Sequence, residues 1–190
     1  MNRNMHTTWL GVRLFTVLGL AGCSVSPVLA SSIGTEGGQV ELKATNLGKV
    51  ELQALPATFS SKTEVQLSVT QTKETTEDFN STPVTRPGRL RRLPGEIRVQ
   101  TGKSKPRSSI KLQLQLPVKL VPSSGTLKVM AQLFYESDTE ILDSFDEIDS
   151  SFEAATRTLR FELEPSYFTS ARGKSGKVEA VVVIVIDSGK

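Results

Sequence analysis

Few side chains in this sequence suit nucleophilic, acid–base or metal chemistry. Its 190 residues include one histidine, His6, and one cysteine, Cys23. From residue 24 onward the chain holds neither, so no Ser-His-Asp or Cys-His catalytic arrangement can be built there. The same stretch lacks imidazole and thiolate ligands for a transition metal. We therefore predict a protein that is not an enzyme, with no catalytic residue, no metal and no cofactor.

One segment concentrates positive charge. Residues 86–107 contain eight basic side chains, and Glu96 is the only acid among them. Such a segment either binds an anionic polysaccharide or lipid head group, or forms a solvated loop, and both interpretations stay open. Nucleic acid is not an expected partner, because no aromatic stacking platform accompanies the arginines. The candidate anion-binding residues are Arg86, Arg89, Arg91, Arg92, Lys103, Lys105 and Arg107.

A second segment is acidic. Residues 136–153 hold eight Asp and Glu side chains and no Lys or Arg. We predict that they complement the basic segment, either within one molecule or between copies. Calcium binding stays open, because oxygen-rich clusters hold Ca²⁺, although this segment lacks the glycine and spacing of an EF-hand loop.

The first residues are typical of an export signal. Arg3 and Arg13 precede an apolar run over residues 14–22, with no acid among them. This run is shorter than the roughly 20 residues that cross a bilayer, and the layout is that of a cleaved secretory signal. Removing residues 1–22 also removes both arginines, which takes the formal net charge from +3 to +1.

The end of this signal, Leu20-Ala21-Gly22-Cys23, resembles the lipobox of bacterial lipoproteins. The resemblance implies a diacylglyceryl group on the Cys23 thiol, cleavage before Cys23, and acylation of the new amino terminus, for example by palmitate. It also implies a lipid-anchored protein of the bacterial cell envelope. The outer membrane is expected, because Ser24 rather than Asp follows the cysteine. The alternative is ordinary cleavage after Val28-Leu29-Ala30, which would give a secreted or periplasmic protein.

The remaining chain shows the alternation of β-strands. Apolar side chains occupy every second position of residues 64–70, and shorter alternating runs recur between turn residues. Residues 178–186 are nearly all apolar, which is typical of a central strand buried on both faces. We predict an all-β fold, an immunoglobulin-like antiparallel β-sandwich over residues 39–187. Further strands are expected at residues 40–44, 50–52, 109–116, 126–135 and 159–163.

Residues 37–67 resemble the opening of ZU5-type β-sandwich modules. Gly37-Gly38-Gln39-Val40 comes first, an apolar stretch leads to Pro56, and Thr63-Glu64-Val65 follows. Ala57-Thr58-Phe59 departs from the small corner of that family. The resemblance implies an interaction or surface module rather than a catalytic one.

The domain organisation follows from composition. Residues 23–38 are small and polar and are expected to form a flexible tether. Residues 74–95 hold three prolines and few apolar side chains, which predicts a long loop within one domain. The alternative is two small β domains split near this segment.

Together these patterns predict a non-enzymatic, lipid-anchored surface protein of the cell envelope that acts as a protein-binding or assembly module. Its expected contacts are the membrane, through the N-terminal lipid, and either an envelope protein or a second copy of itself. The alternative is a protein that binds an anionic glycan or lipid head group through residues 86–107.

Overall fold

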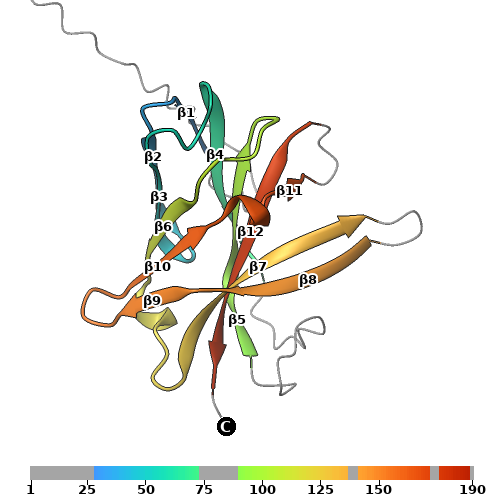
Figure 1. The fold of residues 1–190 in the computed structure, drawn as a ribbon. Coiled ribbons are helices and arrows are strands. Elements are labelled where there is room, and N and C mark those ends of the chain that lie inside the picture. Colours follow the sequence, from blue (N-terminus) through green and yellow to red (C-terminus); the bar gives the residue numbers. More distant parts are fainter. Residues whose placement is uncertain (1–27, 73–89, 137–140, 172–175, 189–190) are drawn as a thin grey trace, which may run out of the picture.

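The computed structural model describes residues 28–72, 90–136, 141–171 and 176–188. Within these ranges the chain forms β-strands and two single-turn 3-10 helices, η1 (Val118–Leu120) and η2 (Pro165–Tyr167) (Figure 1). The strands are β1 (Val28–Ile33), β2 (Gly38–Thr45), β3 (Gly48–Ala54), β4 (Thr63–Thr70), β5 (Leu90–Thr101), β6 (Ile110–Gln115), β7 (Thr126–Glu136), β8 (Ile141–Ile148), β9 (Ser150–Glu153), β10 (Thr158–Leu163), β11 (Thr169–Ser170) and β12 (Val178–Asp187).

These strands form two antiparallel sheets. The first has the order β1-β4-β5-β12-β7-β8, with the short β11 also paired to β12, and the second has the order β2-β3-β6-β10-β9. Both sheets join strands from either side of residues 73–89, through the β4–β5 pair in one and the β3–β6 pair in the other. The prediction of an all-β sandwich is confirmed, and its immunoglobulin-like character stays a prediction.

Alternating residues of the two sheets form the core. Inward side chains of β3, β6 and β10 meet those of β4, β5 and β12, and polar side chains occupy the positions between them. This is the pattern that an antiparallel sheet adopts when one face is buried. The most deeply buried members include Val50, Leu52, Leu114, Leu159, Val65, Leu67, Ile97, Val99, Val182 and Ile184.

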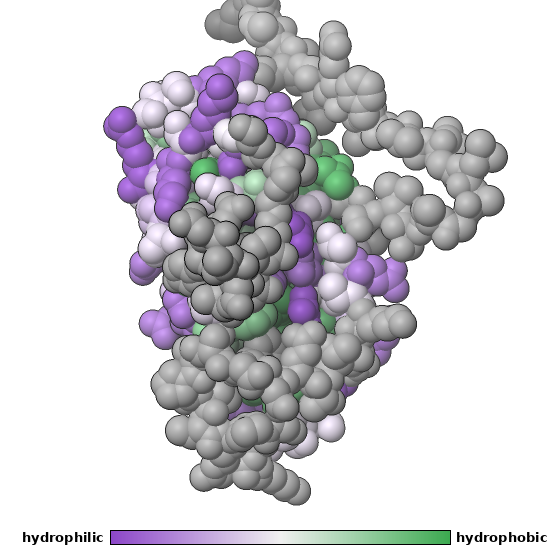
Figure 2. All heavy atoms as spheres, turned by 90° about the vertical axis from the view of Figure 1, so that its right-hand side faces the viewer, coloured by the Kyte–Doolittle hydropathy of each residue, from purple (hydrophilic) through white to green (hydrophobic). Residues whose placement is uncertain are grey.

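Strand β12 is central and buried on both faces, as its composition predicts. It pairs with β5 on one side and β7 on the other. On the face away from the main core, Val183 and Val185 pack with Leu90 and Met130 in a second apolar cluster. On the side of the molecule turned to the viewer in Figure 2, the hydrophobic colour shows only in small separate areas among hydrophilic and grey atoms.

Two expectations about irregular segments are wrong. Part of the expected tether forms β1. This strand pairs antiparallel with β4, from Val28 opposite Ser68 to Ile33 opposite Thr63. An edge strand needs few apolar residues, because only one of its faces is buried. In β1 the side chains of Leu29 and Ile33 contact the core. Part of the expected loop, residues 90–95, belongs to β5. Its Pro-Gly pair lies where the register with β12 shifts between Val183 and Val185, and such a bulge accommodates proline.

The segment 141–153 passes from one sheet to the other. Its first part, β8, pairs with β7 and forms an edge of the first sheet, whereas β9 pairs with β10 and forms an edge of the second. Only Asp149 separates the two strands. Figure 1 shows β8 and β9 as nearly one continuous strand, with the β7–β8 hairpin projecting from the sandwich.

Candidate functional site: a groove at the fork between the sheets

The passage of segment 141–153 between the sheets opens a fork beside β10. Ser150 still pairs with Phe161 of β10, but Ile148 already pairs with Val129 of β7. The pairing of β10 with β9 therefore ends at Phe161, and the next residues of β10 run along the open side of the fork. We call the hollow at this position the fork groove.

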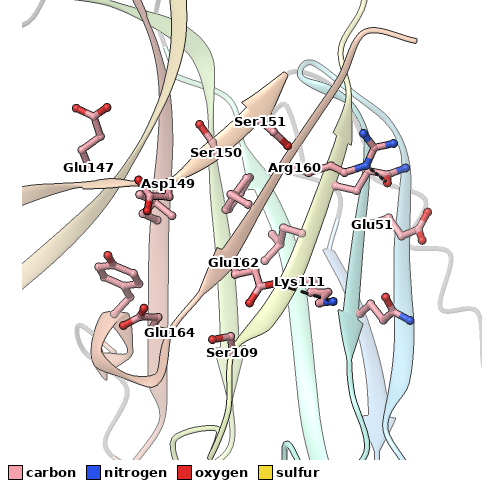
Figure 3. A pocket seen from close by; sticks show the side chains of 16 residues that line it. Glu51, Ser109, Lys111, Glu147, Asp149, Ser150, Ser151, Arg160, Glu162 and Glu164 are labelled. Atoms are coloured by element: carbon pink, nitrogen blue, oxygen red, sulfur yellow. Dashed lines mark hydrogen bonds and ion pairs between the residues drawn. The ribbon is translucent and has the colours of Figure 1, made fainter. Parts of the chain in front are cut away.

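The fork groove has a volume of about 760 Å³ and extends over the outer face of the second sheet. Alternation places one set of side chains from β3, β6 and β10 on this face, and β8, β9 and η2 form the other wall. Figure 3 shows Glu147 and Asp149 on one side, Glu162 and Lys111 in the middle, and Arg160 and Glu51 on the other side. The remaining lining residues are Gln53, Ser109, Leu112, Gln113, Ile148, Ser150, Ser151, Phe161, Glu164 and Tyr167.

Negative charge exceeds positive charge in this groove. Five carboxylates line it, from Glu51, Glu147, Asp149, Glu162 and Glu164, against two cationic side chains. One of these cations, Arg160, bonds Gln113 through Nε at 3.0 Å and pairs with Glu153 through Nη1 at 3.1 Å. The other, Lys111, lies 3.9 Å from Glu162.

The excess charge is concentrated at the fork. Lys128 Nζ lies 3.0 Å from Glu147 Oε2 and so compensates that carboxylate. In the part of the chain that the structure describes, neither Asp149 nor Glu164 has an ion pair; Glu164 accepts only a long hydrogen bond from Ser166 Oγ at 3.4 Å. The fork end of the groove thus presents two carboxylates that no neighbouring cation balances.

Tyr167 brings an aromatic ring to the same end. It is the last residue of η2, whose position is fixed by the fully buried Phe168 that follows. Burial raises the pKa of the Tyr167 phenol above its usual range, and the charges of Glu164, Asp146 and Asp149 raise it further. Both causes disfavour the phenolate, so the phenol stays neutral. A neutral aromatic ring attracts a cation placed over its face.

The structure does not bring the candidate anion-binding residues together. Arg91 and Arg92 lie at the start of β5, whereas Lys103, Lys105 and Arg107 lie in the loop after its end. Residues 93–101 of the strand separate Arg92 from the loop, a length of roughly 30 Å. Arg86 and Arg89 lie outside the described residues. The basic side chains that the structure places therefore do not form one continuous patch, and anion binding by this segment stays a prediction.

Part of the basic segment is neutralised by carboxylates within the first sheet. Arg92 Nη2 lies 3.0 Å from Glu96, which also accepts a hydrogen bond from Arg98 Nε. Arg98 Nη1 lies 3.4 Å from Glu179, and Gln100 Nε2 donates to the same carboxylate at 2.8 Å. Arg92, Glu96 and Glu179 are buried. These groups form an internal polar network rather than a surface for ligands.

Glu179→Ala is expected to destabilise the fold by about 2–4 kcal/mol, because it removes the buried acceptor of two hydrogen bonds and leaves part of the positive charge uncompensated. Urea unfolding measures the change. Glu64→Ala is the matched control, since Glu64 also accepts a hydrogen bond from a glutamine of the same sheet, Gln66, but is exposed. Equal losses for the two variants would contradict the structural role of Glu179.

The acidic segment has its described ion pairs outside the basic segment. Glu147 pairs with Lys128, and Glu153 pairs with Arg160. These pairs do not follow the expectation that residues 136–153 bind the basic segment within one molecule. Among the described residues, no three His, Cys, Asp or Glu side chains lie close enough together to hold a metal ion.

The sequence did not single out the fork groove. Its residues on β3, β6 and β10, such as Lys111 and Gln113, are the polar residues expected on the exposed face of any half-buried strand. The one available signal is the acidic segment, which contributes Glu147 and Asp149. Cys23, the predicted lipidation residue, lies outside the described residues.

No protein-family model matches this chain, and no curated protein matches its sequence. The lipobox and ZU5-like resemblances stay predictions. Over the residues that were searched, no helix has the length and apolar character needed to cross a membrane.

Proposed function

We propose that this protein is a non-enzymatic, lipid-anchored module of the bacterial cell envelope that binds a cationic segment of a partner protein in the fork groove. The observation that carries the proposal is the pair Asp149 and Glu164 beside the ring of Tyr167, since neither carboxylate has an ion pair with any residue that the structure describes. A Lys or Arg side chain entering there gains charge-assisted hydrogen bonds and a cation–π contact.

The side chains after the signal support a binding role over catalysis. From residue 24 onward the sequence has no histidine and no cysteine. The groove is lined by carboxylates, hydroxyls and amides, with Lys111 and Arg160 as its cations. This inventory of donors and acceptors suits the recognition of a polar chain segment.

The position of β1 supports processing before Cys23 over cleavage after Ala30. Cleavage after Ala30 would remove Val28, Leu29 and Ala30, which are half of β1 and include Leu29, one of its two residues that contact the core. Processing before Cys23 leaves the strand complete. Only residues 24–27 then separate the acylated cysteine from β1, and four residues span at most about 14 Å. A lipid on Cys23 would thus hold the sandwich close to the membrane surface.

A second candidate function is the binding of an anionic glycan or head group. The observation that favours it is the loop over residues 102–108, where Lys103, Lys105 and Arg107 are exposed. Arg92 belongs to the internal network, so this candidate depends on the loop rather than on the whole basic segment.

The proposal is tested by titrating the protein with a blocked hexapeptide of alternating Lys and Arg at low ionic strength. The double variant Asp149→Asn/Glu164→Gln is expected to bind it about tenfold more weakly than the unaltered protein, because both unbalanced charges are removed. Bound peptide is also expected to lower the pKa of Tyr167, since a nearby cation favours the phenolate.

The control is Glu36→Gln/Glu64→Gln, which removes the same charge from exposed positions outside the groove. It is expected to change the affinity less than twofold, in keeping with screening of distant surface charges. Equal affinity of the groove variant and the unaltered protein would overturn the proposed site.

A further inference from the structure

We propose that the cationic segment held in the fork groove is the loop 102–108 of a second copy of this chain, so that two copies form a reciprocal dimer. This inference rests on the proposed function of the groove and identifies its partner. It follows from the shape of the loop, its charge, and its position beside the groove.

The loop, which we call the basic loop, is held by its backbone. Arg107 N donates to Thr58 O at 2.8 Å, and Val178 N donates to Gly102 O at 3.3 Å. The Thr101 hydroxyl donates to Ser104 O at 3.0 Å, and Pro106 is buried. A loop fixed in this way loses little conformational entropy on binding.

The cationic side chains of the basic loop are free to meet a partner. Lys103, Lys105 and Arg107 are all exposed, and residues 102–108 contain no acid. Among the residues that the structure places, none of the three has an ion pair. The loop therefore presents three positive charges at alternate positions of a fixed backbone.

The charges of the two surfaces are complementary. Five carboxylates and two cations line the groove, so its lining is acidic, whereas the basic loop carries three positive charges and no acid. Complementary charge of this kind selects a partner and its orientation. The groove has a volume of about 760 Å³, which is room for several side chains of a partner.

The relative position of the two surfaces favours a closed pair. Ser109, the residue that follows the basic loop, is itself part of the groove lining. The loop therefore adjoins the groove at Ser109. Two copies related by a two-fold axis can each place the loop in the groove of the other, and such isologous contacts end the assembly at a dimer.

The test uses the chain from residue 23 with Cys23→Ser, studied by analytical ultracentrifugation. A dimer is expected at low ionic strength and a shift towards monomer as salt is raised, because the contact depends on charge. Two variants reverse one surface each: Lys103→Glu/Lys105→Glu/Arg107→Glu for the loop, and Asp149→Lys/Glu164→Lys for the groove. Each is expected to be at least tenfold weaker in self-association.

Mixing the two variants is the decisive measurement. The reversed loop then meets a reversed groove, and the original loop meets an original groove, so the mixture is expected to form a heterodimer. The control Lys43→Glu/Lys119→Glu reverses two exposed lysines outside the loop and the groove and is expected to dimerise more strongly than the loop variant. Circular dichroism checks that every variant keeps its strands.

The outcomes separate this inference from the proposed function. A monomer at every salt concentration, or a mixture that does not associate, overturns the dimer. If the groove nevertheless binds the Lys/Arg hexapeptide, the groove is a site for a different cationic protein. If the hexapeptide does not bind the monomeric loop variant, whose groove no partner loop fills, both proposals are overturned. Binding of the loop to anionic glycan or lipid vesicles in place of dimerisation assigns the loop to the second candidate function and also overturns the dimer.

Discussion

Cys23→Ala is expected to move the protein from the membrane fraction to the soluble fraction of fractionated cells. The proposed anchor consists of two or three acyl chains, and each buried methylene contributes roughly 0.8 kcal/mol to membrane binding. Two chains hold a protein firmly where one holds it only marginally. Without the thiol no diacylglyceryl group is attached, so we expect at least a tenfold loss of membrane-bound protein, measured by immunoblot of both fractions.

Ser24→Ala provides the control, because it changes the neighbouring residue and leaves the thiol in place. It is expected to remain in the membrane fraction. Unchanged membrane association of a processed Cys23→Ala protein would show that the lipid is not the anchor. A mature amino terminus at Ser31, read by mass spectrometry, would instead establish ordinary cleavage inside β1.

Gly48→Ala is expected to lower the free energy of unfolding by about 2–4 kcal/mol. Gly48 ends the turn between β2 and β3 with φ +96°, a backbone conformation that favours glycine. A Cβ atom there would lie 2.2 Å from the Gln115 carbonyl oxygen and 2.9 Å from Pro117 Cδ. The obstacle is backbone of a neighbouring strand, which cannot rotate away, so the β3–β6 pairing must shift. Urea unfolding measures the loss.

Gly102→Ala is the matched control. Gly102 has no positive φ, and its nearest contact for a new Cβ is Thr63 Cγ2 at 3.9 Å, an ordinary packing distance. We expect its unfolding free energy to change by less than about 0.5 kcal/mol. If both variants unfold at the same urea concentration, the close approach of Gly48 to β6 does not contribute to stability.

Strands with a clear alternation were predictable from the sequence. Residues 64–70 fall within β4, and residues 126–135 fall within β7. The buried position of β12 was predictable as well, because a strand that is apolar at nearly every position must have both faces covered. In these strands the residues that the sequence pattern marks as apolar are also the ones that the packing of the sheets buries.

Other elements were not predictable, because tertiary contacts compensate for weak local signals. Pro94 and Gly95 are typical of a loop, yet they lie within β5 at the bulge opposite β12. The backbone of Gly95 lies against the buried Leu47, where a Cβ would come within 2.5 Å of Leu47 Cγ. Glycine here reflects packing from the β2–β3 turn, which is distant in sequence.

The candidate site was predictable only in part. The acidic segment indicated where negative charge collects, and it supplies Glu147 and Asp149 to the groove. Glu162, Glu164 and Tyr167 come from residues that follow in the chain, but their position beside Asp149 depends on the point at which segment 141–153 leaves β10. That point is fixed by the pairing of β8 with β7, which the sequence pattern does not reveal.

The course of segment 141–153 also bears on how the protein avoids sticking to other chains. Through β8 and β9, one run of chain forms an outer edge of both sheets, where exposed backbone groups invite an additional strand. Charges on such edges discourage aggregation, and Asp146, Glu147, Asp149 and Glu153 lie along this run. The carboxylates of this run that belong to the proposed site for a cationic partner would also repel unspecific β-pairing, so their removal is expected to favour fibrous aggregation.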